Sequence, residues 1–159
     1  MDKFSSFLEW VQQKMLVVGA VCLMGMATLT CCDIVGRFFN YPIFGGEEIV
    51  TIFAVLVIGF TLPYAHSQKS HIGVEMLTRL LSQKKQDYIK VVTDIIALIL
   101  FLTVAWRMAL YARTMQLSGE VSMNLELPEY GVIYVLSFCF AIFSLFIFND
   151  IILFFKKRK

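Results

Sequence analysis

The stretch MLVVGAVCLMGMATLTCCDIV, residues 15–35, decides the fold of this protein, because its 21 residues carry one charged side chain, Asp33, close to the end. An α-helix rises 1.5 Å per residue, so roughly 20 apolar residues cross the ~30 Å hydrocarbon core of a bilayer. The run is continuous rather than alternating, which is typical of a transmembrane helix and not of a barrel strand. A signal peptide has a shorter apolar region, of about 7–15 residues. We therefore interpret 15–35 as a retained membrane span.

Three further apolar segments predict membrane spans at 48–67, 89–111 and 128–155. The composition agrees with this interpretation: 58% of the 159 residues are hydrophobic, 16% are charged, and the mean hydropathy is +0.74. A soluble domain carries about 25% charged residues. We expect an all-α integral membrane protein with four transmembrane helices, forming a single membrane domain over 1–159.

Lysine and arginine residues are distributed unevenly among the segments that flank the spans. The N-terminal segment, the loop after the second span and the tail at 156–159 are basic. By contrast, Arg37 is the one basic residue in the loop between the first two spans, and Arg113 is the one basic residue in the loop between the last two. Under the positive-inside rule, this alternation places both termini and the second loop in the cytoplasm. The net charge of +2 is explained by this topology and does not indicate a nucleic-acid partner.

Two segments outside the spans have the pattern of amphipathic helices that lie in the membrane plane. In KSHIGVEMLTRLLSQKK, residues 69–85, apolar residues recur at helical spacing on one face. We predict an amphipathic cytoplasmic arm at 70–85, either a connector bound to the membrane surface or a docking arm for another subunit. A second stripe predicts an amphipathic N-terminal helix at 1–14, and consists of Phe4, Phe7, Leu8 and Val11. Basic residues in the arm and tail also favour contact with membrane lipids.

Few residues have the spacing of a catalytic, cofactor or metal site. The two histidines, His66 and His71, are close neighbours near one membrane surface, which argues against haem ligation inside the bundle. No metal-ligand spacing connects the four cysteines, which are Cys22, Cys31, Cys32 and Cys139. We expect no catalytic residue, no cofactor and no metal. The alternatives that stay open are a membrane thiol oxidase using Cys31 and Cys32, an anchor subunit of a respiratory complex, and an independent four-helix exporter.

Charged residues lie near the ends of the spans and not at their centres. Asp33 and Arg37 are one helical turn apart, and Glu47 and Glu48 open the second span at the same level. An ion-coupled transporter that works alone would carry a buried carboxylate at the membrane midplane. The pattern therefore favours a scaffold or accessory subunit of a larger assembly rather than an enzyme.

Three stretches resemble a known family by their order and spacing. They are DIVGRFFNYPIFGGEEIVTIFAVLVIGF (33–60), HSQKSHIGVEMLTRL (66–80) and SGEVSMNLELPEYGVIY (118–134). Together they resemble the small membrane subunit, of the Q type and DctQ-like, of tripartite ATP-independent periplasmic (TRAP) transporters. The matching residues are Arg37, Phe38, Asn40, Tyr41, Pro42, Glu48, Lys69, His71, Ile72, Gly73, Val74, Glu75, Ser118, Leu127 and Pro128. The sequence departs from the family at 61–64, where small residues are common.

The resemblance implies a non-catalytic subunit in the bacterial inner membrane. It implies a scaffold for a large, elevator-type, ion-coupled membrane subunit, with contact to a periplasmic binding protein that delivers an organic acid, such as a C4-dicarboxylate or a sialic acid. We expect Asp33, Arg37 and Glu48 to form a polar cluster that fixes the first helix to the second or to the large subunit. We expect His71 and Glu75 to position the start of the cytoplasmic arm.

Overall fold

Four α-helices make up the part of the chain that the computed structural model describes, namely residues 2–67 and 83–157, with side chains described over 6–67 and 88–154. In chain order they are α1 (Asp2–Phe38), α2 (Gly46–Ser67), α4 (Gln83–Ser118) and α5 (Tyr130–Lys157). Segments long and apolar enough to cross a membrane are Ser6–Phe38, Gly46–Ser67, Tyr88–Ser118 and Tyr130–Phe154. No strand occurs in the described ranges. The predicted all-α class with four span-length helices is confirmed.

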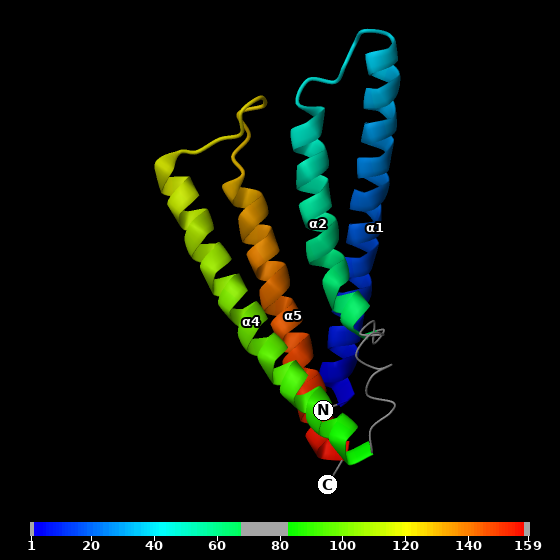
Figure 1. Cartoon of the computed structure of the whole chain (residues 1–159), viewed down its shortest axis with the longest axis vertical. Coiled ribbons are helices and arrows are strands. Elements are labelled where there is room, and N and C mark those ends of the chain that lie inside the picture. The colour runs from blue at the N-terminus through cyan, green and yellow to red at the C-terminus, as the bar shows by residue number, and fades with distance from the viewer. Residues whose placement is uncertain (1, 68–82, 158–159) are drawn as a thin grey trace.

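The helices form two hairpins that meet along one line of contact. Helix α1 packs on α2, α4 packs on α5, and the contact between α2 and α5 joins the two hairpins. Figure 1 shows the hairpins converging where both chain termini lie and diverging toward the loops 39–45 and 119–129. We call these two ends the terminal end and the loop end.

Helix α1 is longer than the predicted span. Residues 2–38 form one helix of 37 residues, about 55 Å long, so a break between an in-plane helix at 1–14 and a span at 15–35 is not seen. No glycine or proline interrupts residues 2–18. The buried stripe is Leu8, Gln12 and Met15, each at most 8% exposed. Gln12 donates a hydrogen bond to the Ser67 hydroxyl of α2. This stripe faces protein, and an in-plane orientation of the segment is not confirmed.

Helix α4 also extends past its predicted limits of 89–111, because it covers Gln83–Ser118. Its first residues, 83–85, were expected to end the amphipathic arm. The remainder of that arm, residues 70–82 with His71 and Glu75, lies outside the described residues.

Helix α5 is the most buried of the four helices. In the most apolar stretch of α5, a third of the residues are buried, whereas 11% are buried in the most apolar stretch of each of the other three helices. Its buried face carries Cys139, Phe143 and Ile147, spaced one turn apart. Phe143 packs edge-on against Phe101 of α4, with ring centroids 4.6 Å apart, and against His66 of α2 at 5.3 Å. Helix α5 therefore connects the two hairpins through its aromatic side chains.

The C-terminal caps of α1 and α4 direct the two loops at the loop end. Asn40 adopts a φ of 58°, and the Tyr41 amide donates a 2.8 Å hydrogen bond to the Gly36 carbonyl. Gly119 adopts a φ of 68°, and the Glu120 amide donates in the same way to the Met115 carbonyl at 3.3 Å. Both are Schellman-type caps, in which a left-handed residue ends the helix and turns the chain.

Candidate functional site

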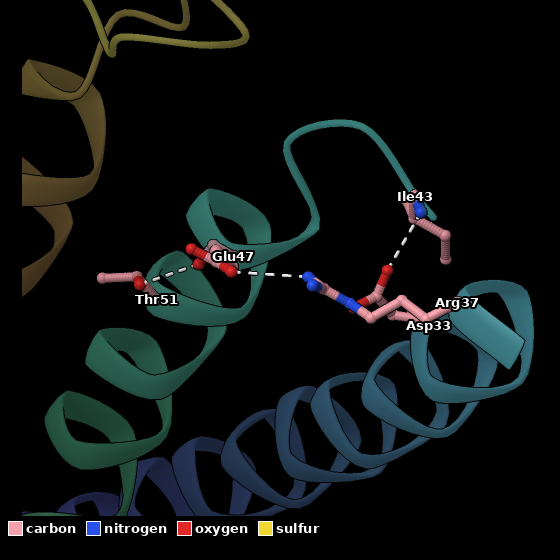
Figure 2. A network of polar contacts seen from close by, with 5 residues as sticks. All are labelled: Asp33, Arg37, Ile43, Glu47 and Thr51. Carbon is pink, nitrogen blue, oxygen red and sulfur yellow. Dashed lines mark hydrogen bonds and ion pairs between the residues drawn. The ribbon is translucent and has the colours of Figure 1, made fainter. Parts of the chain in front are cut away.

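The first polar group at the loop end connects α1 to α2. Arg37 Nε lies 2.7 Å from Asp33 Oδ2, one turn earlier on α1. Arg37 Nη2 lies 3.4 Å from Glu47 Oε1 at the start of α2. The second carboxylate oxygen of Asp33 accepts a 2.9 Å hydrogen bond from the Ile43 amide. Figure 2 shows the guanidinium between the two carboxylates, so this network holds the 39–45 loop against the helices that it joins.

Glu48 points away from this network and holds the other loop. Its carboxylate accepts a 2.7 Å hydrogen bond from the Ser122 hydroxyl. It also accepts hydrogen bonds from two backbone amides, that of Asn124 at 2.8 Å and that of Leu125 at 3.1 Å. Ser122 is buried, and its hydroxyl also accepts a 3.1 Å bond from the Leu127 amide. We call this arrangement the Glu48 clamp. It ties the start of α2 to the 119–129 loop of the opposite hairpin.

The predicted polar cluster of Asp33, Arg37 and Glu48 thus divides into two groups in the structure. The cation Arg37 contacts Asp33 and Glu47, while Glu48 bonds to the 119–129 loop. Sequence reasoning did not find Ser122 and Asn124. Both lie more than 70 residues from Glu48 along the chain, and polar residues in a loop carry no signal that identifies a distant partner.

A close backbone approach accompanies the Glu48 clamp. Gly45 has a φ of +70°, and a Cβ atom at this position would lie 2.3 Å from Leu125 Cγ. Only glycine combines that backbone conformation with so near a neighbour. Leu125 of the 119–129 loop therefore packs directly against the turn at Gly45 that precedes α2.

We expect Gly45→Ala to lower the melting temperature of the purified protein more than Gly119→Ala does. Both substitutions place a side chain in a left-handed conformation, which costs roughly 1–2 kcal/mol. Only Gly45→Ala also meets Leu125, since nothing lies within 4 Å of a Cβ at Gly119. The measurement is thermal unfolding in detergent, followed by near-ultraviolet circular dichroism. Equal shifts for the two variants would contradict the close approach.

A second polar group lies where the hairpins converge at the terminal end. His66 Nε2 of α2 lies 3.5 Å from Asp150 Oδ2 of α5, and the His66 side chain is 11% exposed. These residues line a cavity of about 130 Å³ together with Leu8 and Gln12 of α1. The two hairpins are thus joined by polar contacts at both ends.

The remaining sequence candidates occupy separate places. Cys31 and Cys32 are exposed neighbours on α1, and Cys139 is buried in α5. Across the described ranges, no group of three or more histidine, cysteine, aspartate or glutamate residues could hold a metal ion. His71 and Glu75 lie outside the described residues.

Two paired helical hairpins of membrane-spanning length, with polar groups at both ends, define a multi-pass helical membrane protein. Residues 26–157 match the sequence model of a family described as "Tripartite ATP-independent periplasmic transporters, DctQ component". The chain belongs to this family, and the resemblance found in the motifs is confirmed. The protein is accordingly a TRAP transporter component. Comparisons with curated proteins and with solved structures returned no match.

Proposed function

We propose that this chain is the non-catalytic small membrane subunit of a TRAP-type secondary transporter that imports an organic acid. It acts as a scaffold for the large ion-coupled membrane subunit. The observation that carries the proposal is the family match over residues 26–157. The distribution of charge supports it, because the helix segments 15–32, 49–62, 95–106 and 131–149 contain no charged side chain. Such helices offer packing surface and leave the ion and substrate sites to the partner.

We propose that both termini lie in the cytoplasm, in a bacterial inner membrane, so that the loop end faces the periplasm. The alternation of basic residues along the sequence supports this orientation. The position of both termini at one end of the bundle is compatible with it. The proposed partners are the large membrane subunit, the periplasmic binding protein and membrane lipids. His71 and Glu75 keep their proposed role at the start of the cytoplasmic arm.

The test is co-purification through a C-terminal tag from native membranes in a mild detergent, with mass spectrometry of the eluate. We expect a much larger polytopic partner and no chromophore. A folded chain that elutes alone would overturn the proposal and favour the exporter, and a coloured complex would favour the respiratory anchor. A Cys31→Ser/Cys32→Ser double variant should support uptake at the unmodified rate, and a loss of activity there would point to thiol chemistry instead.

We expect Arg37→Ala to reduce the yield of the assembled complex and the uptake rate without changing the preference between two competing organic acids. The effect should be partial, because the Arg37 side chain is 55% exposed and exposed ion pairs contribute little. Arg37→Lys should retain part of the function, since a lysine keeps the charge but not the planar fork. Arg113→Ala, an exposed arginine on α4, is the matched control. A changed substrate preference in Arg37→Ala would contradict a scaffolding role.

A further inference from the structure

Helix α4 carries a charged residue, Arg107, on the side that faces away from the rest of the chain. On its inner side, the Ala105 carbonyl accepts a 2.7 Å hydrogen bond from the buried Ser137 hydroxyl of α5. Neighbouring residues on a helix point about 100° apart, so Arg107, two residues later, projects from nearly the opposite side. The Arg107 residue is exposed. Because α4 packs on α5 and α5 packs on α2, this side of α4 is an outer face of the bundle (Figure 1).

The packing of α5 on α2 sets the depth of Arg107 in the bundle. Gly59, near the middle of α2, approaches Leu136 of α5, and the next residue, Ser137, bonds to Ala105. Arg107 is therefore only about 3 Å along the helix from this level. Helix α2 has 22 residues, which gives about 33 Å and matches the ~30 Å hydrocarbon core. From the predicted span 89–111, Arg107 would lie near the outer end, whereas the tertiary structure places it level with the middle of α2.

A guanidinium at this depth is costly unless another group neutralises it. Charged side chains within membrane spans are rare, and they pair with one another or face the interior of a bundle. Among the described residues, the Arg107 side chain makes no ion pair and no hydrogen bond. About 15 Å separates the middle of the bilayer core from either headgroup layer, which is farther than an arginine side chain extends from its helix. Lipid tails are therefore an unfavourable neighbour for this residue.

The residues around Arg107 form one apolar helix face. Leu100, Thr103, Arg107 and Leu110 are spaced by three or four residues, so they lie on the same side of α4. Leu100 is 55% exposed and Leu110 is 41% exposed. The Thr103 hydroxyl is satisfied within α4, because it donates a 2.7 Å hydrogen bond to the Ile99 carbonyl. We call these four residues the Arg107 face. It offers apolar packing surface with one charge at its centre.

We propose that the Arg107 face packs against a transmembrane helix of another protein, which presents an aspartate or glutamate to the guanidinium near the middle of the membrane. This inference rests on the proposed function, under which that protein is the large membrane subunit. The ion pair is enclosed between the two subunits. A single polar contact in an otherwise apolar interface specifies the register of the packed helices. The pair would thus fix the height of this subunit against its partner.

Co-purification of the large subunit through a C-terminal tag tests the proposal. Arg107→Leu should lower the amount of co-purified large subunit by about tenfold or more, because truncation of one member of a buried charge pair leaves the other unpaired. Arg113→Leu is the matched control, since Arg113 is an exposed arginine about 9 Å further along α4. The amount of tagged chain in the membranes should be the same for all variants. Equal co-purification with Arg107→Leu and Arg113→Leu would overturn the inference.

Charge reversal identifies the partner carboxylate. Arg107→Glu should assemble as poorly as Arg107→Leu, because it places two acids opposite each other. In the Arg107→Glu background, each intramembrane aspartate or glutamate of the large subunit is then replaced by lysine, one at a time. One of these replacements should restore co-purification, and failure of every replacement would count against the ion pair.

Photo-crosslinking in native membranes tests the neighbour of the Arg107 face directly. A photoreactive amino acid in place of Thr103 should capture the large subunit, and capture of lipid alone would overturn the inference. If the unmodified chain brings down no large subunit, the proposed function fails and this interface with it. If the unmodified chain and Arg107→Leu bring down equal amounts, only the interface at Arg107 fails.

Discussion

Replacement of Gly59 by leucine is expected to separate the two hairpins and prevent assembly of the complex. Gly59 is buried in α2 where this helix meets α5. A Cβ atom there would lie 3.0 Å from Leu136 Cδ1 and 3.4 Å from Cys139 Cβ. Small residues let membrane helices approach closely, and inserting carbon atoms into a filled interface costs about 1–3 kcal/mol or more. The line of contact between the hairpins offers no room for a leucine side chain.

The experiment compares Gly59→Leu with Gly131→Leu, a matched change in α5 at which nothing lies within 4 Å of a Cβ atom. Size-exclusion profiles and melting temperatures in detergent give the readout. Gly59→Ala should cause a smaller loss, because its nearest neighbour is the flexible end of Leu136. Leu136→Ala should partly rescue Gly59→Leu by opening space. The packing of α2 on α5 would be disproved by equal behaviour of the Gly59→Leu and Gly131→Leu proteins.

Replacement of Glu48 by alanine is expected to release the 119–129 loop and to reduce both assembly and uptake strongly. The carboxylate accepts three hydrogen bonds from this loop. Bonds to charged acceptors are stronger than neutral ones. The buried Ser122 would lose its acceptor. Substrate preference should stay unchanged, because the residue contacts a loop of its own chain.

Limited proteolysis measures the release of the loop. A glutamate-specific protease should cleave at Glu120 and Glu126 several-fold faster in Glu48→Ala than in the unmodified protein. Glu47→Ala is the control, because the Glu47 side chain is 86% exposed and makes a single 3.4 Å contact, with Arg37. Glu48→Gln should fall between the two, since it keeps one acceptor oxygen. The clamp would be refuted by equal cleavage rates in Glu48→Ala and Glu47→Ala.

The membrane-spanning helices could be predicted from the sequence because their signal is local. The run at 15–35 and the three segments after it are apolar over the length that a bilayer requires, and this property needs no knowledge of the partner helices. The limits of α1 were less predictable. An amphipathic stripe at 1–14 has the same pattern whether it faces a lipid surface or other helices, and here Leu8, Gln12 and Met15 pack inside the protein.

The sequence by itself determined four membrane-length helices and membership of the TRAP transporter family. Only the tertiary structure decided how the adjacent acids Glu47 and Glu48 divide their contacts. Neighbouring residues on a helix point about 100° apart, so one carboxylate reaches Arg37 and the other reaches Ser122 in the opposite hairpin. That choice depends on where the 119–129 loop lies in space, which no local pattern in the sequence contains.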